Sequence, residues 1–302
     1  MPQRRLGEKL NKLLHFEFQI PAGESESMDL SLSADEVMDQ LDGEKSSSLF
    51  LGHYTEKQVA DAMEATDILP RLRKKGFTDL IFRIGAKDRF EHQLLIYYDR
   101  EDREHLLGQI LIKEGVFRPK TRFVSEIPLE RLEMLFIGWI LMQDPLGIFT
   151  PERQRLPGQT YPGLGVGHQV VDLILRACKR LEKDGVLNFP EFYHNAFFYS
   201  ELFFFYNPGK QGEIMALWRD LGHLGIVRLS FAVYFECVRD LARDHGYEWL
   251  PEEQVLPVRG VILDYFDSRE YWDAARESFE RCRFGIDEKK LEACMRERAG
   301  EV

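Results

Sequence analysis

The sequence predicts a mixed α+β fold, in which a central, mostly antiparallel sheet is flanked by helices and extended at both ends. Between residues 79 and 142, apolar runs alternate with short charged turns, a pattern typical of antiparallel strands. From residue 168 onward, apolar residues recur with helical spacing. The chain has 302 residues, 44% of them hydrophobic, which is enough for one large body with a sizeable core.

Charge and hydropathy argue against two classes of partner. Acidic residues outnumber basic ones by 51 to 40, so the average surface repels the phosphate backbone of a nucleic acid. No run approaches the roughly 20 apolar residues that cross a bilayer, and the N-terminus lacks the pattern of a signal peptide. We therefore expect a cytoplasmic protein without a nucleic-acid or membrane partner, and the oligomeric state is left open.

The cysteines give no sign of a metal site or a disulfide framework. They lie far apart and form no pair with the spacing of metal ligands. Cys178 falls within an apolar helical pattern and is expected in the core. The four cysteines are Cys178, Cys237, Cys282 and Cys294.

The first 76 residues are expected to form an N-terminal extension. A short helix is predicted over residues 34–41. A second helix opens at Thr55, because Gln58 follows three residues later in the pattern of a capping box. This helix is expected to run to Lys75 and to stop at Gly76.

A core unit is predicted over residues 77–207, beginning with strands at 79–84, 92–99 and 104–117. Residues 132–142 form a fourth run. Its almost continuous hydrophobicity predicts a central strand covered on both faces, with a buried helix as the alternative.

The second half of this core alternates between helix and strand. An irregular segment rich in Pro, Gly and Gln leads to a helix over residues 168–185, which is expected to stop at its final glycine. Residues 186–189 predict a buried strand, and a helix is predicted at about 194–203.

Residues 208–302 are expected to complete the core or to pack against it. After a helix at 213–221, residues 230–246 predict either a strand leading into a helix or a helix throughout. Residues 258–266 predict a strand. Residues 271–298 predict helix with a break near Gly285.

A glycine-rich turn at residues 161–169 carries the strongest chemical signal. Gly163, Gly165 and Gly167 allow backbone N–H groups to surround an anion at the start of a helix. A phosphate or pyrophosphate is therefore the expected ligand. The dinucleotide-binding fingerprint does not fit, because the glycine spacing differs, no strand precedes the turn and no acidic residue ends the next strand.

The turn and a second segment together resemble the GNAT acetyltransferase superfamily. Gly165-Val166-Gly167, followed by two valines, is similar to the family's pyrophosphate loop, with Pro162 where the family has glutamine or arginine. The family's Tyr-x-x-Leu-Gly-Phe segment is matched from Tyr199 to Phe204, with Phe203 in place of the glycine. The resemblance spans residues 77–207 and implies a GNAT-like acyl-CoA N-acyltransferase fold.

What this resemblance implies for binding is a site for acetyl-CoA or another acyl-CoA as co-substrate. In such folds two strands splay apart, and the pantetheine arm lies between them like an added strand. Here these would be residues 132–142 and 186–189. The residues expected to bind CoA are Gly163, Leu164, Gly165, Val166, Gly167 and His168 in the turn, Leu141 before it and Asn188 after it.

For catalysis, the resemblance implies direct transfer of the acyl group to an amine, with Tyr199 as the general acid. Glu130 and Glu133, near the start of the central strand, and His194, beside the acyl site, are the candidate bases. The alternative for Tyr199 and His194 is a packing role in an aromatic helix. For Glu130 and Glu133 the alternative is a solvated position at the end of the strand. No metal ligand is expected.

Three functions are therefore open. The first is an N-acyltransferase acting on an amine that the sequence does not identify. The second is a non-catalytic GNAT-like protein that serves binding or protein contacts. The third is an enzyme of another class that uses the glycine turn for a nucleotide.

Overall fold

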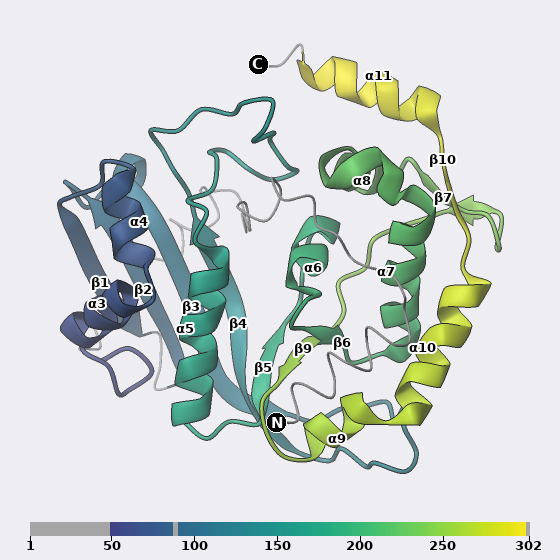
Figure 1. Cartoon of the computed structure of the whole chain (residues 1–302), viewed down its shortest axis with the longest axis horizontal. Helices are drawn as coiled ribbons and strands as arrows, with labels where there is room; N and C mark the ends of the chain where they lie inside the picture. The colour runs from purple at the N-terminus through teal and green to yellow at the C-terminus, as the bar shows by residue number, and fades with distance from the viewer. Residues whose placement is uncertain (1–48, 87–89, 300–302) are drawn as a thin grey trace.

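The computed structural model describes residues 49–86 and 90–299 of the chain (Figure 1). A seven-stranded sheet, in the order β1-β2-β3-β4-β5-β9-β6, runs through the centre. All of its pairings are antiparallel except β4 with β5. The predicted mixed α+β fold with a mostly antiparallel sheet is thus confirmed. The strands are β1 Leu80–Ala86, β2 Glu91–Tyr98, β3 Leu106–Phe117, β4 Leu132–Met142, β5 Gly185–Asn188, β6 Phe204–Phe205 and β9 Gln254–Pro257.

Helices pack on this sheet, and a second sheet of three strands, in the order β10-β7-β8, lies beyond it. The helices are α3 Glu56–Ala65, α4 Ile68–Lys74, α5 Gly167–Arg180, α6 Tyr193–Tyr199, α7 Pro208–Leu221, α8 Gly225–Tyr234, α9 Val261–Asp267, α10 Arg269–Arg281 and α11 Glu288–Ala299. The small sheet comprises β7 Val238–Asp240, β8 His245–Gly246 and β10 Phe284–Ile286.

The predicted start of the first helix is confirmed, and its length is corrected. The capping box forms, with the Gln58 backbone N–H donating to the Thr55 hydroxyl and the Thr55 N–H donating to the Gln58 side chain. The helix does not run unbroken to Lys75. Asp67 adopts φ 66°, which divides it into α3 and α4. The helix predicted at 34–41 lies outside the described residues.

The main prediction that fails is the strand at 258–266. Gly260, with φ 72°, turns the chain into helix α9, while the strand itself comes earlier as β9. Ile262, Tyr265 and Phe266 are all buried, which is helical spacing of three and four residues.

Two other helices end at positions that differ from the prediction, because a residue other than glycine takes the left-handed conformation. Glu182, with φ 53°, follows the end of α5, so Gly185 is the first residue of β5 and not a helix stop. Glu236, also at φ 53°, follows the end of α8. Residues 230–246 therefore run from helix to strand, which neither alternative had predicted. The break near Gly285 is confirmed and forms β10.

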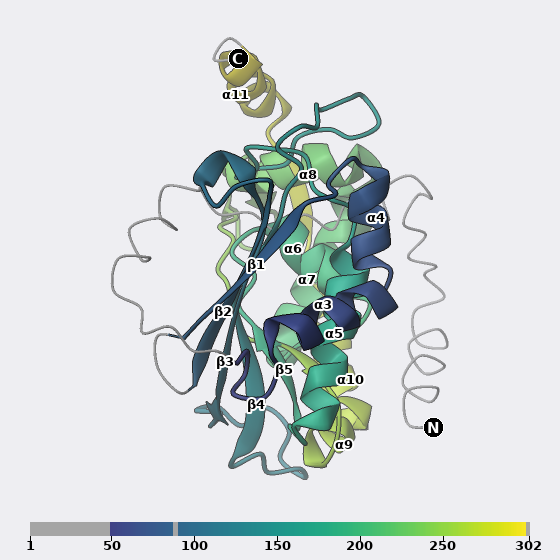
Figure 2. The same ribbon diagram turned by 90° about the vertical axis from the view of Figure 1, so that its left-hand side faces the viewer.

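Helices α3, α4 and α5 lie along one face of the sheet (Figure 2). The core beneath α3 and α5 includes Leu94, Ile110 and Ile112. Cys178 is buried there, as predicted, and burial raises the pKa of its thiol to about 12. Every helix in the described part of the chain falls short of a membrane span in length or in hydropathy.

Candidate functional site

The one parallel pairing of the large sheet is short and ends in an opening. Strands β4 and β5 pair only from Met134 to Phe136. Just beyond, the register between β3 and β4 slips by one residue, which leaves Gly138 as a β-bulge. Within the described chain, the edge of β4 from residue 137 to 141 has no partner strand. At about 3.3 Å per residue, this free edge is about 16 Å long.

The glycine turn lies at the far end of this free edge. Gln143 forms a bridge with Gly163, and the Leu164 N–H donates to the Met142 carbonyl oxygen at 3.1 Å. The side chains of Leu164 and Val166 are buried, so they anchor the turn in the core.

Within the turn, Gly165 adopts φ 71°, a conformation that strongly favours glycine, and α5 starts at Gly167. The backbone N–H groups of residues 165–169 find no acceptor among the residues described. Unpaired N–H groups and the positive end of the helix dipole together suit an anion.

A cavity of about 100 Å³ occupies the gap between the two strands. Three of its lining residues carry a buried polar atom that has no hydrogen-bond partner within the described part of the chain: Trp139 Nε1, Asn188 Oδ1 and Asn195 Oδ1. A buried polar atom without a partner is destabilising by about 1–3 kcal/mol, so such atoms mark a place where a ligand can supply the missing hydrogen bonds. The lining is residues 137–140 of β4, residues 188–191 after β5, and Asn195 and Tyr199 of α6.

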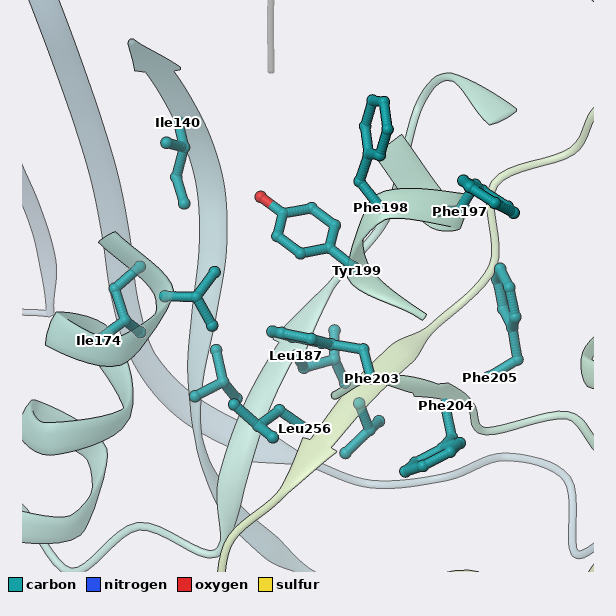
Figure 3. Close-up of a cluster of buried hydrophobic side chains, with 14 of the residues drawn as sticks. Ile140, Ile174, Leu187, Phe197, Phe198, Tyr199, Phe203, Phe204, Phe205 and Leu256 are labelled. Atoms are coloured by element: carbon teal, nitrogen blue, oxygen red, sulfur yellow. The ribbon is translucent and has the colours of Figure 1, made fainter. Parts of the chain in front are cut away.

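Tyr199 presents its hydroxyl group to this gap. Its side chain extends from α6 toward Ile140 on β4, with the hydroxyl oxygen at its tip (Figure 3). The ring is buried and packs on Phe203 at 5.0 Å between ring centroids. No hydrogen bond of the hydroxyl to another described residue is found. Burial raises the pKa of Tyr199, so the group keeps its proton at neutral pH.

The structure thus brings together most of the residues that the sequence singled out for binding. Tyr199 and Asn188 line one cavity, and residues 163–168 lie at the other end of the free edge of β4. Leu141 belongs to that edge. Its side chain is buried in a small cluster with Leu95, Tyr97 and Leu106, so its backbone is the part available to a ligand.

The candidate bases lie elsewhere. Glu133 is near the start of β4, six residues from Trp139 and hence about 20 Å away, and it pairs with the Arg131 guanidinium at 2.5 Å. Glu130 is exposed in the loop before β4. His194 is fully buried, stacks on Phe192 at 5.3 Å and does not line the cavity. Their roles as bases stay predictions.

Trp139 is a lining residue that the sequence reasoning missed. A tryptophan within an apolar strand is indistinguishable from a core residue until its indole N–H is seen without a partner. Glu191, an exposed residue that also lines the cavity, was missed as well. The sequence around a loop glutamate does not show whether it lines a cavity or only faces solvent.

The burial of His194 leads to a testable pH dependence of stability. Both ring nitrogens lack partners among the described residues, and burial lowers the pKa from 6.5 to about 3. As the pH falls below 6.5, the histidine is protonated in the unfolded chain but stays neutral in the folded protein. The free energy of unfolding is therefore full above pH 6.5 and decreases as the pH falls. When the pH is lowered from 7 to 5, the unfolding free energy of the wild type should fall by about 2 kcal/mol more than that of His194→Phe, as measured by urea titration. Equal losses in the two proteins would contradict the burial of a neutral imidazole.

Comparison with protein-family models, curated proteins and solved structures found no match for this chain. Among the residues that the structure describes, no group of three or more His, Cys, Asp or Glu side chains could hold a metal ion.

Proposed function

We propose that this protein is a GNAT-like N-acyltransferase that takes its acyl group from acetyl-CoA or a related acyl-CoA and transfers it to an amine. The observation that carries the proposal is the free edge of β4, which has the glycine turn at one end and the cavity with Tyr199 at the other. This arrangement suits a long ligand with a phosphate-rich part and an extended arm.

The described residues fit the two parts of CoA separately. The backbone N–H groups of residues 165–169, which have no acceptor among the described residues, suit a pyrophosphate. The free edge of β4 suits an extended arm that bonds to strand backbone as an added strand would. The pantetheine arm contains amide groups, which can pair with the side chains of Asn188, Asn195 and Trp139.

An acyl-CoA thioester supplies an acyl group already activated for transfer to a nucleophile. Tyr199 would hold a proton on its hydroxyl oxygen and donate it to the sulfur as the carbon–sulfur bond breaks and the carbon–nitrogen bond forms. Trp139 lines the same cavity and carries a buried indole N–H without a partner among the described residues, which would bond the acyl carbonyl oxygen. The amine must lose one proton, and Glu133 and His194 stay the predicted bases.

Calorimetric titration of acetyl-CoA into the full chain tests the cofactor. We expect micromolar binding that Gly165→Glu/Gly167→Glu abolishes, because two carboxylates would fill and repel at the phosphate site. Gly165 has φ 71°, so this variant is also strained. A second variant, His168→Glu, avoids the strain, since His168 is exposed in the first turn of α5, where an acidic residue favours the helix.

His168→Glu should weaken binding at least tenfold while the melting temperature is unchanged or higher. The matched control is His245→Glu, which makes the same change at an exposed position in the small sheet and should bind as the wild type does. Folded wild-type protein that does not bind acetyl-CoA would overturn the proposal. Binding of NAD or ATP in its place would point to a nucleotide enzyme of another class.

A further inference from the structure

A second, larger cavity lies between α3, α5 and the sheet. Its volume is about 270 Å³, and it shares no lining residue with the cavity between β4 and β5. Figure 2 shows α3 and α5 on the same face of the sheet. The apolar lining is Phe50, Leu51, Val59, Ala62, Ala65, Leu94, Ile110, Ile112, Leu173, Ile174 and Ala177.

The cavity opens to solvent, and its floor is formed by the buried apolar residues Leu94, Ile110 and Ile112 of the sheet. For comparison, an engineered apolar cavity of about 150 Å³ stays dry and binds benzene. Empty apolar volume is destabilising, because the atoms that line it lose contacts. A ligand with an apolar chain would restore those contacts, and small residues such as Ala62, Ala65 and Ala177 leave the room for it.

The polar groups of the lining are donors or are already engaged. The Thr66 hydroxyl donates to the Ala62 carbonyl oxygen, and Arg176 pairs with Asp172 at 2.8 Å. Gln58 accepts the Thr55 N–H through its side-chain oxygen, so its NH₂ group is the end left to donate. None of the described residues that line the cavity carries a carboxylate.

Among the described lining residues, Arg180 is the cation without a carboxylate beside it. Its guanidinium lies 5.8 Å from the centroid of the Tyr54 ring, and both residues line the cavity. Among the described residues it has no carboxylate partner, although its neighbour Arg176 and many other arginines of the chain do. It is exposed, so it lies where the cavity meets solvent.

We infer that this cavity binds a small amphipathic anion, namely a carboxylate with an unbranched apolar chain of medium length. The chain would lie against Ile110, Ile174 and Ala177, and the carboxylate would lie at the mouth near Arg180 and the Gln58 amide. The inference does not depend on the proposed acyltransferase activity, because none of its residues belongs to the site between β4 and β5.

Calorimetric titration of the full chain with sodium octanoate tests the class of ligand. Octanoate should bind and raise the melting temperature, and affinity should increase about fourfold for each CH₂ from hexanoate to octanoate. Octylamine, which has the same chain and the opposite charge, should bind at least tenfold more weakly. The inference is wrong if folded wild-type protein does not bind octanoate, or if octylamine binds as tightly.

Two variants test whether octanoate binds in the cavity or at a nonspecific surface site. Ala177→Phe on α5 and Ala62→Phe on α3 fill the cavity from opposite sides, and each should weaken octanoate binding at least tenfold. Circular dichroism shows which of the two folds, and one folded variant is enough for the test. Octanoate binding that survives in a folded filled variant would overturn the inference.

The charge at the mouth is tested by a matched pair. Arg180→Gln should weaken octanoate binding about three- to fivefold, as expected for an exposed ion pair, and should leave octanol binding unchanged. Lys179→Gln removes the same charge from the adjacent, exposed position, which does not line the cavity. It should bind octanoate as the wild type does. Equal effects of the two variants would contradict the assigned role of Arg180.

Discussion

Gly212→Ala is expected to lower the free energy of unfolding by about 3 kcal/mol, although Gly-to-Ala exchanges inside helices usually stabilise. Gly212 lies in the second turn of α7, where that helix contacts α10. A Cβ atom at this position would lie 2.1 Å from the Ala275 carbonyl oxygen and 2.8 Å from the Phe279 backbone nitrogen. Backbone atoms of a helix cannot move aside as the end of a side chain can.

The two helices would therefore have to separate, and the contacts between them would weaken. The Ser278 hydroxyl donates to the Gly209 carbonyl oxygen at 2.7 Å, and Arg219 donates to the carbonyl oxygens of Phe279 and Cys282. Urea denaturation followed by circular dichroism measures the loss.

The matched control for this prediction is Gly209→Ala in the first turn of α7. Its Cβ would lie 3.1 Å from the side-chain oxygen of Asn207, an atom that can shift by a few tenths of an ångström. We expect a change within about 1 kcal/mol for this variant. A Gly212→Ala protein as stable as the wild type would show that α7 and α10 do not approach so closely.

Tyr199→Phe is expected to lower the rate of acyl transfer by about 10²–10⁴-fold, with acetyl-CoA affinity almost unchanged. The prediction rests on the proposed function. The hydroxyl faces the gap and bonds to none of the described residues, so its removal should not change the fold. Because burial raises the pKa of Tyr199, the acid keeps its proton through pH 6–9, and the rate should not fall in this range through its ionisation.

Tyr265→Phe is the control that separates catalysis from stability. The Tyr265 hydroxyl donates to the Tyr206 carbonyl oxygen at 2.7 Å and is buried, so its loss should reduce the unfolding free energy by about 1–2 kcal/mol. The rate of transfer should stay at the wild-type value. Single-turnover release of free thiol, measured with a panel of amines, gives the rates. An unchanged rate for Tyr199→Phe with an accepted amine would exclude Tyr199 as the acid.

The sequence predicted elements well where local patterns and tertiary structure agree. Residues 132–142 form β4 with the predicted bounds, but the predicted cover on both faces is incomplete: residues 136–139 are partly buried or exposed, because β5 pairs with β4 no further than Phe136. The capping box at Thr55 is equally local. The predictions failed at 258–266 and 230–246, where the helix boundary depends on the backbone conformation of Gly260 and Glu236.

Only part of the candidate site could be predicted from the sequence. A glycine turn and a tyrosine can be read from residue types, and the structure places both beside the same strand edge. That edge and the bulge at Gly138 arise from pairing between strands distant in sequence. No local pattern encodes such pairing.

The position of β9 has a consequence for the order in which the chain can assemble during synthesis. This strand enters the sheet between β5 and β6, although the segment 206–253 separates it from β6 in the sequence. While the ribosome adds this segment, at about 5–20 residues per second, both neighbouring strands expose unpaired edges. A nascent chain is thus vulnerable to aggregation until β9 emerges, and a fragment that ends at residue 207 would never escape that state.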